Sequence, residues 1–402
     1  MKHPFEAKNE SALVPPASYW RWLTTLSLCL PLFLVRIWFL SLPLQYYDFI
    51  TYWTAGHLFV TGGHPYSQAA ISALPQLPGV PAQPQLMLAP PWTLPIVALM
   101  SLWPFRTGQA GWWAISILLN CFSSIGLWMY FGGAKHRFWV AILIAATFIP
   151  MGGAEFMGQI TPLMLASLTA FLLCLKSKRH FAAGALLLGV GFKPHLLYLF
   201  SLAVLLWVLQ TRTWSVLAGA GTALVTATLA TFLFNANALD YFHETYGLAT
   251  TAPCGIGWVL RESLGVQHAW LQFLPCIFGL MWFAFYWARH RRDWDWPTHL
   301  PLLLIVSVAS SPYCWYHDFI LILPALIALA ARGACRVAWV AAAYLGVQAA
   351  IAGADILSPA WMCVASVLWI PFYLAARTVS ASIPEESSVT RGQSNNQPLA
   401  VR

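Results

Sequence analysis

The sequence predicts an all-α polytopic membrane protein. Of its 402 residues, 59% are hydrophobic and only 8% are charged, and the mean hydropathy is +0.66. A soluble domain carries about 25% charged residues, so this composition excludes an ordinary soluble fold. The apolar segments are continuous and lack the alternation of a transmembrane barrel, so they are expected to cross the bilayer as helices. At roughly 20 apolar residues per span, the chain has room for about 12 transmembrane helices, within a range of about 10 to 13.

The first apolar segment, about 22–44, is expected to be an anchor, because "LPLQYYD" follows it where a signal peptide would have a small-residue cleavage site. Residues 44–90 then form a first outer loop with short helices, one of them predicted over 49–60. The run "APPWTLPIVALMSLWPF" at 89–105 is expected to be re-entrant or interfacial. If it crossed instead, there would be about 13 spans, and one basic cluster would lie on the wrong side.

One helical transmembrane catalytic domain is expected over residues 1–377. The remaining residues, 378–402, are rich in Ser, Gln and Asn and predict a disordered cytoplasmic tail.

Lys and Arg gather in short connections, which are normally cytoplasmic. Placing all of them inside puts the opposite loops outside. Membrane topology also explains the net charge of +8, so no nucleic acid partner is expected. The basic positions are Lys2, Lys8, Arg21, residues 135–137, the segment ending at Arg179, Arg212, residues 289–292, Arg332, Arg336 and Arg377.

The unusual polar residues then fall at the outer ends of the spans, which predicts a one-sided polar chamber. A transporter would place its coupling residues near the bilayer midplane, often in broken helices from two repeats, and no clear repeat is visible. A transporter or flippase of lipid-linked sugars remains the alternative, and an inactive scaffold is a third. The chamber residues are Asp48, His57, Glu155, Gln159, Lys193, His195, Asp240, His243, Glu244, Arg261, Glu262, His317 and Asp318.

Four segments, in order between residues 46 and 324, resemble glycosyltransferase family 87, the polyprenyl-phosphate-mannose-dependent α-mannosyltransferases of the GT-C superfamily. The first, "YYDFITYWTAGHLFVTGGHPY", has the family's Asp, short helix and G-x-x-x-Y. The second is the Pro-Pro run in "LAPPWTLPIVALMSLWPF". The third consists of "EFMGQITPLMLASL" followed by "AAGALLLGVGFKPHLL", which resemble the family's G-Q and A-G-x-x-x-G...K-P pair. The fourth, "SSPYCWYHDFILILPAL", resembles the family's S-P-x-x-W-x-H run.

The resemblance implies a GT-C fold and transfer of a sugar, with mannose the default, from a polyprenyl-phosphate carrier to a lipid or glycan acceptor. It also implies inversion at the anomeric carbon and a site on the outer face of the bacterial inner (plasma) membrane, in contact with membrane lipids. An acceptor hydroxyl needs a base to take its proton. Asp48, at the outer end of the first span, is the candidate catalytic base. It could instead cap the helix that follows, and the two roles can coexist.

The leaving phosphate needs cations or hydrogen-bond donors. Lys193 in "GFKPH" interrupts an apolar stretch and is a candidate for this role, although it could instead snorkel to the interface. His317 in "WYHDF" matches the histidine that the family associates with the donor phosphate; its alternative is an ordinary interfacial histidine. Family members often carry Asp between the Trp and the His. Here Tyr316 stands there and Asp318 follows, which leaves the role of Asp318 open.

Further substrate-binding candidates are Gln159, Tyr47, Trp315, His195 and Arg261. Gln159 could bind sugar hydroxyls or cap the next span, and Trp315 could stack on a sugar or belong to an interfacial aromatic belt. The pattern "RRDWDW" contains the D-x-D spacing often used for metal, but it lies in a basic loop that is expected to be cytoplasmic. No metal or other cofactor is expected, because Lys and His can serve a monophosphate leaving group.

Overall fold

The computed structural model describes residues 47–73, 85–245, 255–333, 338–355, 361 and 364–382. In these residues every regular element is a helix, which confirms the predicted all-α class. The expected first span at 22–44 and residues 383–402 lie outside the described residues. Helix α19 runs to Ser382, so it includes residue 378, where the tail was expected to begin.

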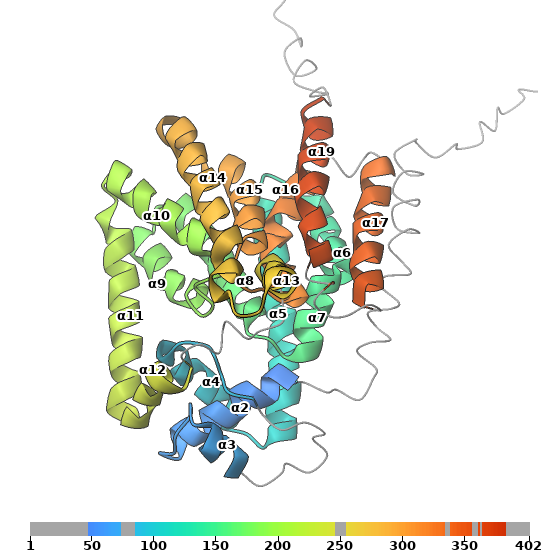
Figure 1. The fold of residues 1–402 in the computed structure, drawn as a ribbon. Coiled ribbons are helices and arrows are strands. Elements are labelled where there is room, and N and C mark those ends of the chain that lie inside the picture. Colours follow the sequence, from blue (N-terminus) through green and yellow to red (C-terminus); the bar gives the residue numbers. More distant parts are fainter. Residues whose placement is uncertain are drawn as a thin grey trace, which may run out of the picture.

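The helices form a bundle with a cap of short helices at one end (Figure 1). The bundle helices are α5 Phe105–Tyr130, α6 Trp139–Thr147, α7 Ile149–Met157, α8 Thr161–Lys176, α9 His180–Val190, α10 Tyr198–Thr211, α11 Trp214–Phe234, α14 Leu274–His290, α15 Trp296–Ala309, α16 Leu323–Ala331, α17 Ala338–Asp355 and α19 Trp369–Ser382. Shorter elements are α2 Tyr47–Val60, α3 Gln68–Ala73, η1 Pro91–Thr93, α4 Leu94–Ser101, η2 Lys135–Arg137, η3 Ala236–Asp240, α12 Tyr241–Glu244, α13 Ile256–Leu264, η5 Ala269–Phe273, η6 Arg291–Asp293, η7 Tyr316–Ile322 and η9 Ser366–Leu368.

Three described helical segments are long and apolar enough to cross a membrane: Phe105–Tyr130, Trp214–Phe234 and Ala269–Asp293. The pair Lys135–Thr147 and Ile149–Met157, bent by 63°, could form a fourth. Other apolar helices in the described part are shorter, so the figure of about 12 spans stays a prediction. Helix α4, in the run expected not to cross, has 8 residues. It reaches only about 12 Å against a bilayer core of about 30 Å.

Short connections join neighbouring helices into hairpins, and two kinds of connection alternate along the chain. Helices α8 and α9, α10 and α11, and α14 and α15 contact each other in pairs. Their connections carry Arg179, Arg212 and Arg292 respectively. The connections in between, α7 to α8, α9 to α10 and α15 to α16, carry Gln159, Lys193 and His317. Antiparallel hairpins place these two sets at opposite ends of the bundle.

Helices α9 and α11 approach so closely that only glycine fits at their contact. A Cβ on Gly184 of α9 would overlap the Val216 carbonyl, and one on Gly219 of α11 would overlap the Phe181 carbonyl. Small residues at a helix contact let two backbones approach in membrane proteins. Since α9 leads directly into Lys193, this contact helps to position the lysine.

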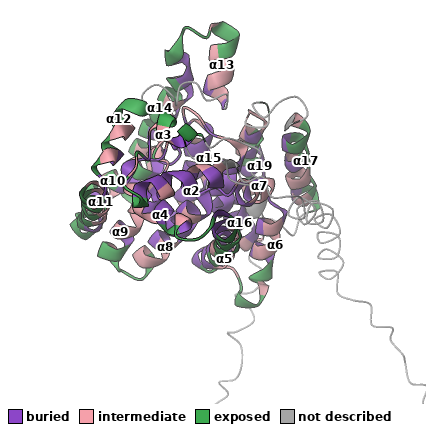
Figure 2. Cartoon of the chain, turned by 90° about the horizontal axis from the view of Figure 1, so that it is seen from below, coloured by how far each residue is buried: buried purple, intermediate pink, exposed green. Residues whose placement is uncertain are grey.

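Helix α2 is held against the bundle by the turn that follows it. Asn235 Nδ2 donates to the carbonyls of Phe59 and Gly63 at 3.1 and 2.9 Å. His64 Nδ1 lies 2.7 Å from Asp240 Oδ2, and Tyr66 OH donates to the Ala89 carbonyl at 2.8 Å. Seen from this end, most described residues of α2 and half of those of α4 are buried, whereas α12 and α13 carry exposed ones (Figure 2). The C-terminal end of α2 is thus fixed against the bundle.

Candidate active site

Asp48 lies in the first turn of α2 and meets the connection between α7 and α8. Gln159 Nε2 donates to Asp48 Oδ2 at 2.5 Å. Helix α7 ends at Met157 and is capped by Gly158, whose φ of 67° is left-handed and favours glycine. Trp112 Nε1 donates to the Gly158 carbonyl at 3.1 Å. This fixed turn aims the Gln159 side chain at Asp48.

The orientation of the Gln159 amide follows from its other partners. Lys193 Nζ donates to Gln159 Oε1 at 2.9 Å, and Tyr52 OH donates to the same oxygen at 3.2 Å. An ammonium can only donate, so the amide oxygen faces Lys193 and the amide nitrogen faces Asp48. Burial raises the pKa of Tyr52 well above its usual range, so the phenol keeps its proton and donates.

Lys193 also contacts η7, through Asp318. Its Nζ lies 2.7 Å from Asp318 Oδ1, and the Asp318 side chain is only 1% exposed. Asp318 Oδ2 accepts the Trp315 backbone N–H at 3.0 Å, which holds the start of η7. The indole of Trp92, in the Pro-Pro run, donates to the Gly191 carbonyl at 3.2 Å and anchors the segment that carries Lys193.

Two histidines lie next to these contacts, one of them (His317) buried and the other (His195) half-buried. His317 is 2% exposed; its Nε2 is 4.0 Å from Asp318 Oδ1, and neither ring nitrogen has a hydrogen-bond partner in the described structure. His195 stacks on Tyr313 with ring centroids 3.9 Å apart. Burial lowers the pKa of His195 to about 3, so the imidazole is neutral near pH 7. A neutral imidazole still carries one N–H and can donate to an anion.

Burial raises the pKa of Asp48 from 3.8 to about 6. The nearby Lys193 charge and the Gln159 hydrogen bond lower this pKa but do not offset the desolvation, and the Asp318 charge raises it further. A carboxylate with a pKa near neutrality can accept a proton more readily than an ordinary surface Asp.

The other predicted binding residues are placed as follows. The Trp315 ring lies parallel to His317, with centroids 6.3 Å apart. Arg261, in α13, donates to Gln272 Oε1 and the Val266 carbonyl at 3.0 and 2.9 Å, both in the segment after its own helix. Tyr47 begins α2, but its side chain lies outside the described structure.

The remaining acidic candidates are either paired with another residue or exposed. Glu155 is 2% exposed and accepts from Asn120 Nδ2 at 2.6 Å. Asp240 pairs with His64, and Glu244 and Glu262 are exposed. In the D-x-D pattern, Asp295 caps α15 by accepting the Thr298 N–H at 3.1 Å, which is a structural role for this residue.

Two partners of the candidate residues were not singled out from the sequence. Tyr52 lies one helical turn after Asp48, on the same face of α2, so its position was available from helical spacing. Asn120 carried no signal, because a single Asn in an apolar helix does not reveal its partner.

A bundle of apolar helices with a buried carboxylate, amide, lysine and histidine cluster defines a helical membrane protein with an ionisable site at one end. The family model of glycosyltransferase family 87 matches residues 88–318, which is more than half of the chain, and the chain therefore belongs to this family. The predicted resemblance is confirmed, and the protein is a glycosyltransferase of a membrane-bound family. No curated protein and no solved structure matches it. The match covers Gln159, Lys193 and His317 but begins after Asp48.

Proposed function

We propose that this protein transfers a sugar from a polyprenyl-phosphate donor to a hydroxyl of a lipid or glycan acceptor. Mannose is the sugar we expect, and the outer face of the bacterial inner membrane is the expected side. The observation that supports this reaction best is the continuous contact from Asp48 through Gln159 to Lys193. It joins a base of raised pKa to a cation that can hold a phosphate.

In the proposed reaction, the acceptor oxygen attacks the anomeric carbon while Asp48 takes the hydroxyl proton. The bond between the anomeric carbon and the phosphate oxygen breaks, and the polyprenyl phosphate leaves with the bonding electrons. A single displacement of this kind inverts the anomeric carbon. Gln159 holds Asp48 Oδ2, so we assign proton acceptance to Oδ1.

The leaving phosphate would be stabilised by Lys193 and His317. Two of the three ammonium hydrogens of Lys193 are directed at Gln159 and Asp318, which leaves the third for a phosphate oxygen. The buried His317 imidazole can add a second hydrogen bond. Asp318 then acts as a positioning residue, because it holds both Lys193 and the backbone before His317.

This proposal is tested by incubating the purified protein in detergent with a panel of polyprenyl-phosphate sugars and acceptors. Mass spectrometry should detect a new glycosidic product that persists in a chelator, since no metal is expected. The Asp48→Asn variant is the control and should form none. No product from any donor would overturn the proposal.

A transporter or flippase is the alternative function. It would move a labelled lipid-linked sugar across proteoliposomes without forming a product, and Asp48→Asn would leave this movement unchanged. The contacts that gather Asp48, Gln159, Lys193 and Asp318 support the enzyme over an inactive scaffold.

A further inference from the structure

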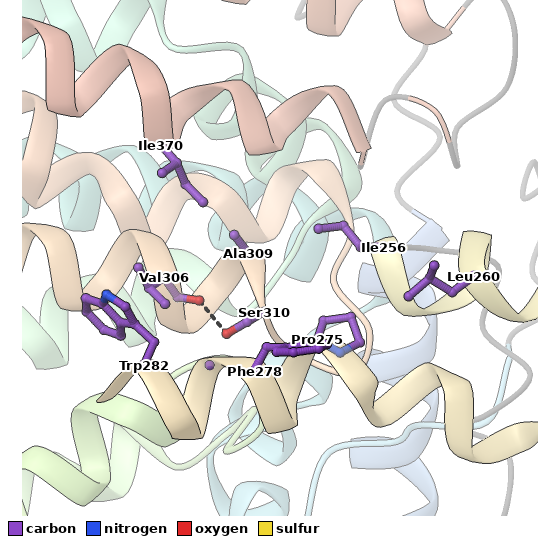
Figure 3. A pocket seen from close by; sticks show the side chains of 10 residues that line it. Ile256, Leu260, Pro275, Phe278, Trp282, Val306, Ala309, Ser310 and Ile370 are labelled. Carbon is purple, nitrogen blue, oxygen red and sulfur yellow. Dashed lines mark hydrogen bonds between the residues drawn. The ribbon is translucent and has the colours of Figure 1, made fainter. Parts of the chain in front are cut away.

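An apolar cavity of about 340 Å³ lies between α13, α14, α15 and α19. Figure 3 shows Phe278 and Trp282 of α14 on one side, Val306 and Ala309 of α15 beside them, and Ile256 of α13 towards one end. Its volume falls within the range of roughly 300 to 1,000 Å³ that is typical of small-ligand sites. None of its lining residues takes part in the proposed reaction.

The wall of the cavity offers little to a polar ligand. Its polar side-chain groups are the Trp282 indole N–H and the Ser310 hydroxyl, and the hydroxyl is already bonded to the Val306 carbonyl at 2.6 Å and to Tyr198 OH at 2.7 Å. A sugar or phosphate placed here would lose its hydrogen bonds to water without replacing them. The wall therefore suits a hydrocarbon.

The cavity lies next to the two connections that carry Lys193 and His317. The connection from Lys193 runs to Tyr198 at the start of α10, whose hydroxyl contacts Ser310. The connection that begins at Ser310 runs in the other direction to His317. A Cβ on Gly255, at the start of α13, would lie 3.5 Å from the Cys314 backbone nitrogen, so α13 packs against this second connection. The cavity therefore borders both connections that carry the residues proposed to hold the phosphate.

The cavity also reaches a surface that is suited to lipid. Helix α14 belongs to a segment long and apolar enough to cross a membrane. Its outward side chains are apolar, with Ile277, Phe278 and Met281 exposed by 47%, 58% and 54%. Phe278 both lines the cavity and lies on this surface, so a hydrocarbon could continue from the cavity into the bilayer.

We infer that this cavity binds the part of the donor's prenyl chain nearest to the phosphate, while the rest of the chain passes Phe278 into the membrane. The inference rests on the proposed function and adds recognition of the carrier lipid to it. The competing occupant, an acyl chain of a bulk phospholipid, is an outcome of the test.

The kinetic test uses Val306→Phe, which fills the cavity, and Ala309→Leu as a second, smaller filling. Val225→Phe is the matched control, because Val225 is 56% exposed on α11, away from the cavity lining. KM is measured for a long-chain donor and for a donor with a single isoprene unit. Both filling variants should raise KM for the long donor about tenfold or more and change that for the short donor little. An unchanged ratio of the two KM values in both variants would overturn the inference.

Binding is tested without turnover by a polyprenyl phosphate that carries a diazirine on its first isoprene units. We expect crosslinks to peptides with Phe278 or Trp282, blocked by excess polyprenyl phosphate but not by phosphatidylglycerol. Crosslinks elsewhere, or equal competition by phosphatidylglycerol, would overturn the inference. Specific labelling without any product from wild type would preserve it and reject the transfer reaction instead.

Discussion

Gln159 is the residue that links the two halves of the site. Its oxygen accepts from Lys193 and Tyr52, and its nitrogen donates to Asp48. The amide therefore has no freedom to turn over, and it orients the carboxylate while it contacts the lysine. Its role in the proposed reaction is to position the base.

The first prediction at this scale concerns pH. Asp48 must be ionised to accept a proton, and burial raises its pKa to about 6, so kcat/KM should rise with pH through about 6. Gln159→Leu removes a hydrogen bond that lowers this pKa, and the rise should move to higher pH. A pH profile of both proteins measures this. A rise near 3.8, the ordinary value for Asp, would contradict it.

The same pKa shift has a consequence for stability. The Asp48 carboxyl loses its proton near 3.8 when unfolded and near 6 when folded. Between these values the folded state binds more protons, so the contribution of Asp48 to the free energy of unfolding falls as pH rises through this window.

The second prediction concerns the buried pair of Lys193 and Asp318. Lys193→Met leaves a carboxylate that is 1% exposed without its cation, which should destabilise the fold by about 3–5 kcal/mol. Adding Asp318→Asn should restore most of the thermal stability but not donor binding. Lys135→Met, in the exposed η2, is the control. Equal unfolding temperatures for the single and double variants would show that the pair does not act as described.

At the scale of elements, the contact of α9 with α11 explains how Lys193 reaches its place. Both helices are apolar, so burial of apolar surface does not drive them together in lipid. The close approach at Gly184 and Gly219 allows their backbones to touch instead. A change at this contact should act on both stability and the site.

The third prediction tests this contact with two glycines of the same helix. Gly219→Ala should destabilise the protein by about 1–3 kcal/mol, because its Cβ would overlap the Phe181 carbonyl. Gly221→Ala, where a Cβ would meet nothing within 4 Å, should be neutral or slightly stabilising. Thermal unfolding of both variants in detergent measures the difference. A similar effect of the two substitutions would contradict the packing.

At the scale of the whole molecule, the fourth prediction concerns topology. The basic connections and those that carry site residues alternate, which predicts opposite faces of the membrane. In a cysteine-free background, Gln68→Cys should be labelled from outside and Asp293→Cys from the cytoplasm; both positions are exposed. Labelling of both from one side would contradict the proposed outer site.

Much of this arrangement could be predicted from the sequence. Composition predicted the helical class, and the helix expected over 49–60 is α2, Tyr47–Val60. The one-sided polar pattern grouped Asp48, Gln159 and Lys193, and in the structure Gln159 bonds to both of the others. The helical class and helix α2 could be predicted because they depend on composition and local sequence, whereas the placement of the polar residues on the outer face stays a prediction.

Other features depend on contacts that local sequence does not specify. Lys193 and Asp318 are 125 positions apart, and their pairing follows from how α9 and η7 pack. Arg261 bonds to residues that follow its own helix, and it reaches them because of the turn between α13 and η5, which the sequence does not reveal. The apolar cavity is formed by side chains from four helices, and the sequence of a single helix does not reveal it.

The central claim is that Asp48 is the base of a glycosyl transfer, and the most direct test is the turnover of Asp48→Asn. Asparagine keeps the size of the side chain and can still accept from Gln159, but it cannot take a proton at neutral pH. We expect kcat to fall by on the order of 10² or more, with the unfolding temperature and the affinity for the polyprenyl-phosphate donor close to those of wild type. Near-normal turnover, or a loss explained by misfolding alone, would contradict the claim and direct the search for the base to Glu155, Asp240, Glu244, Glu262 and Asp318.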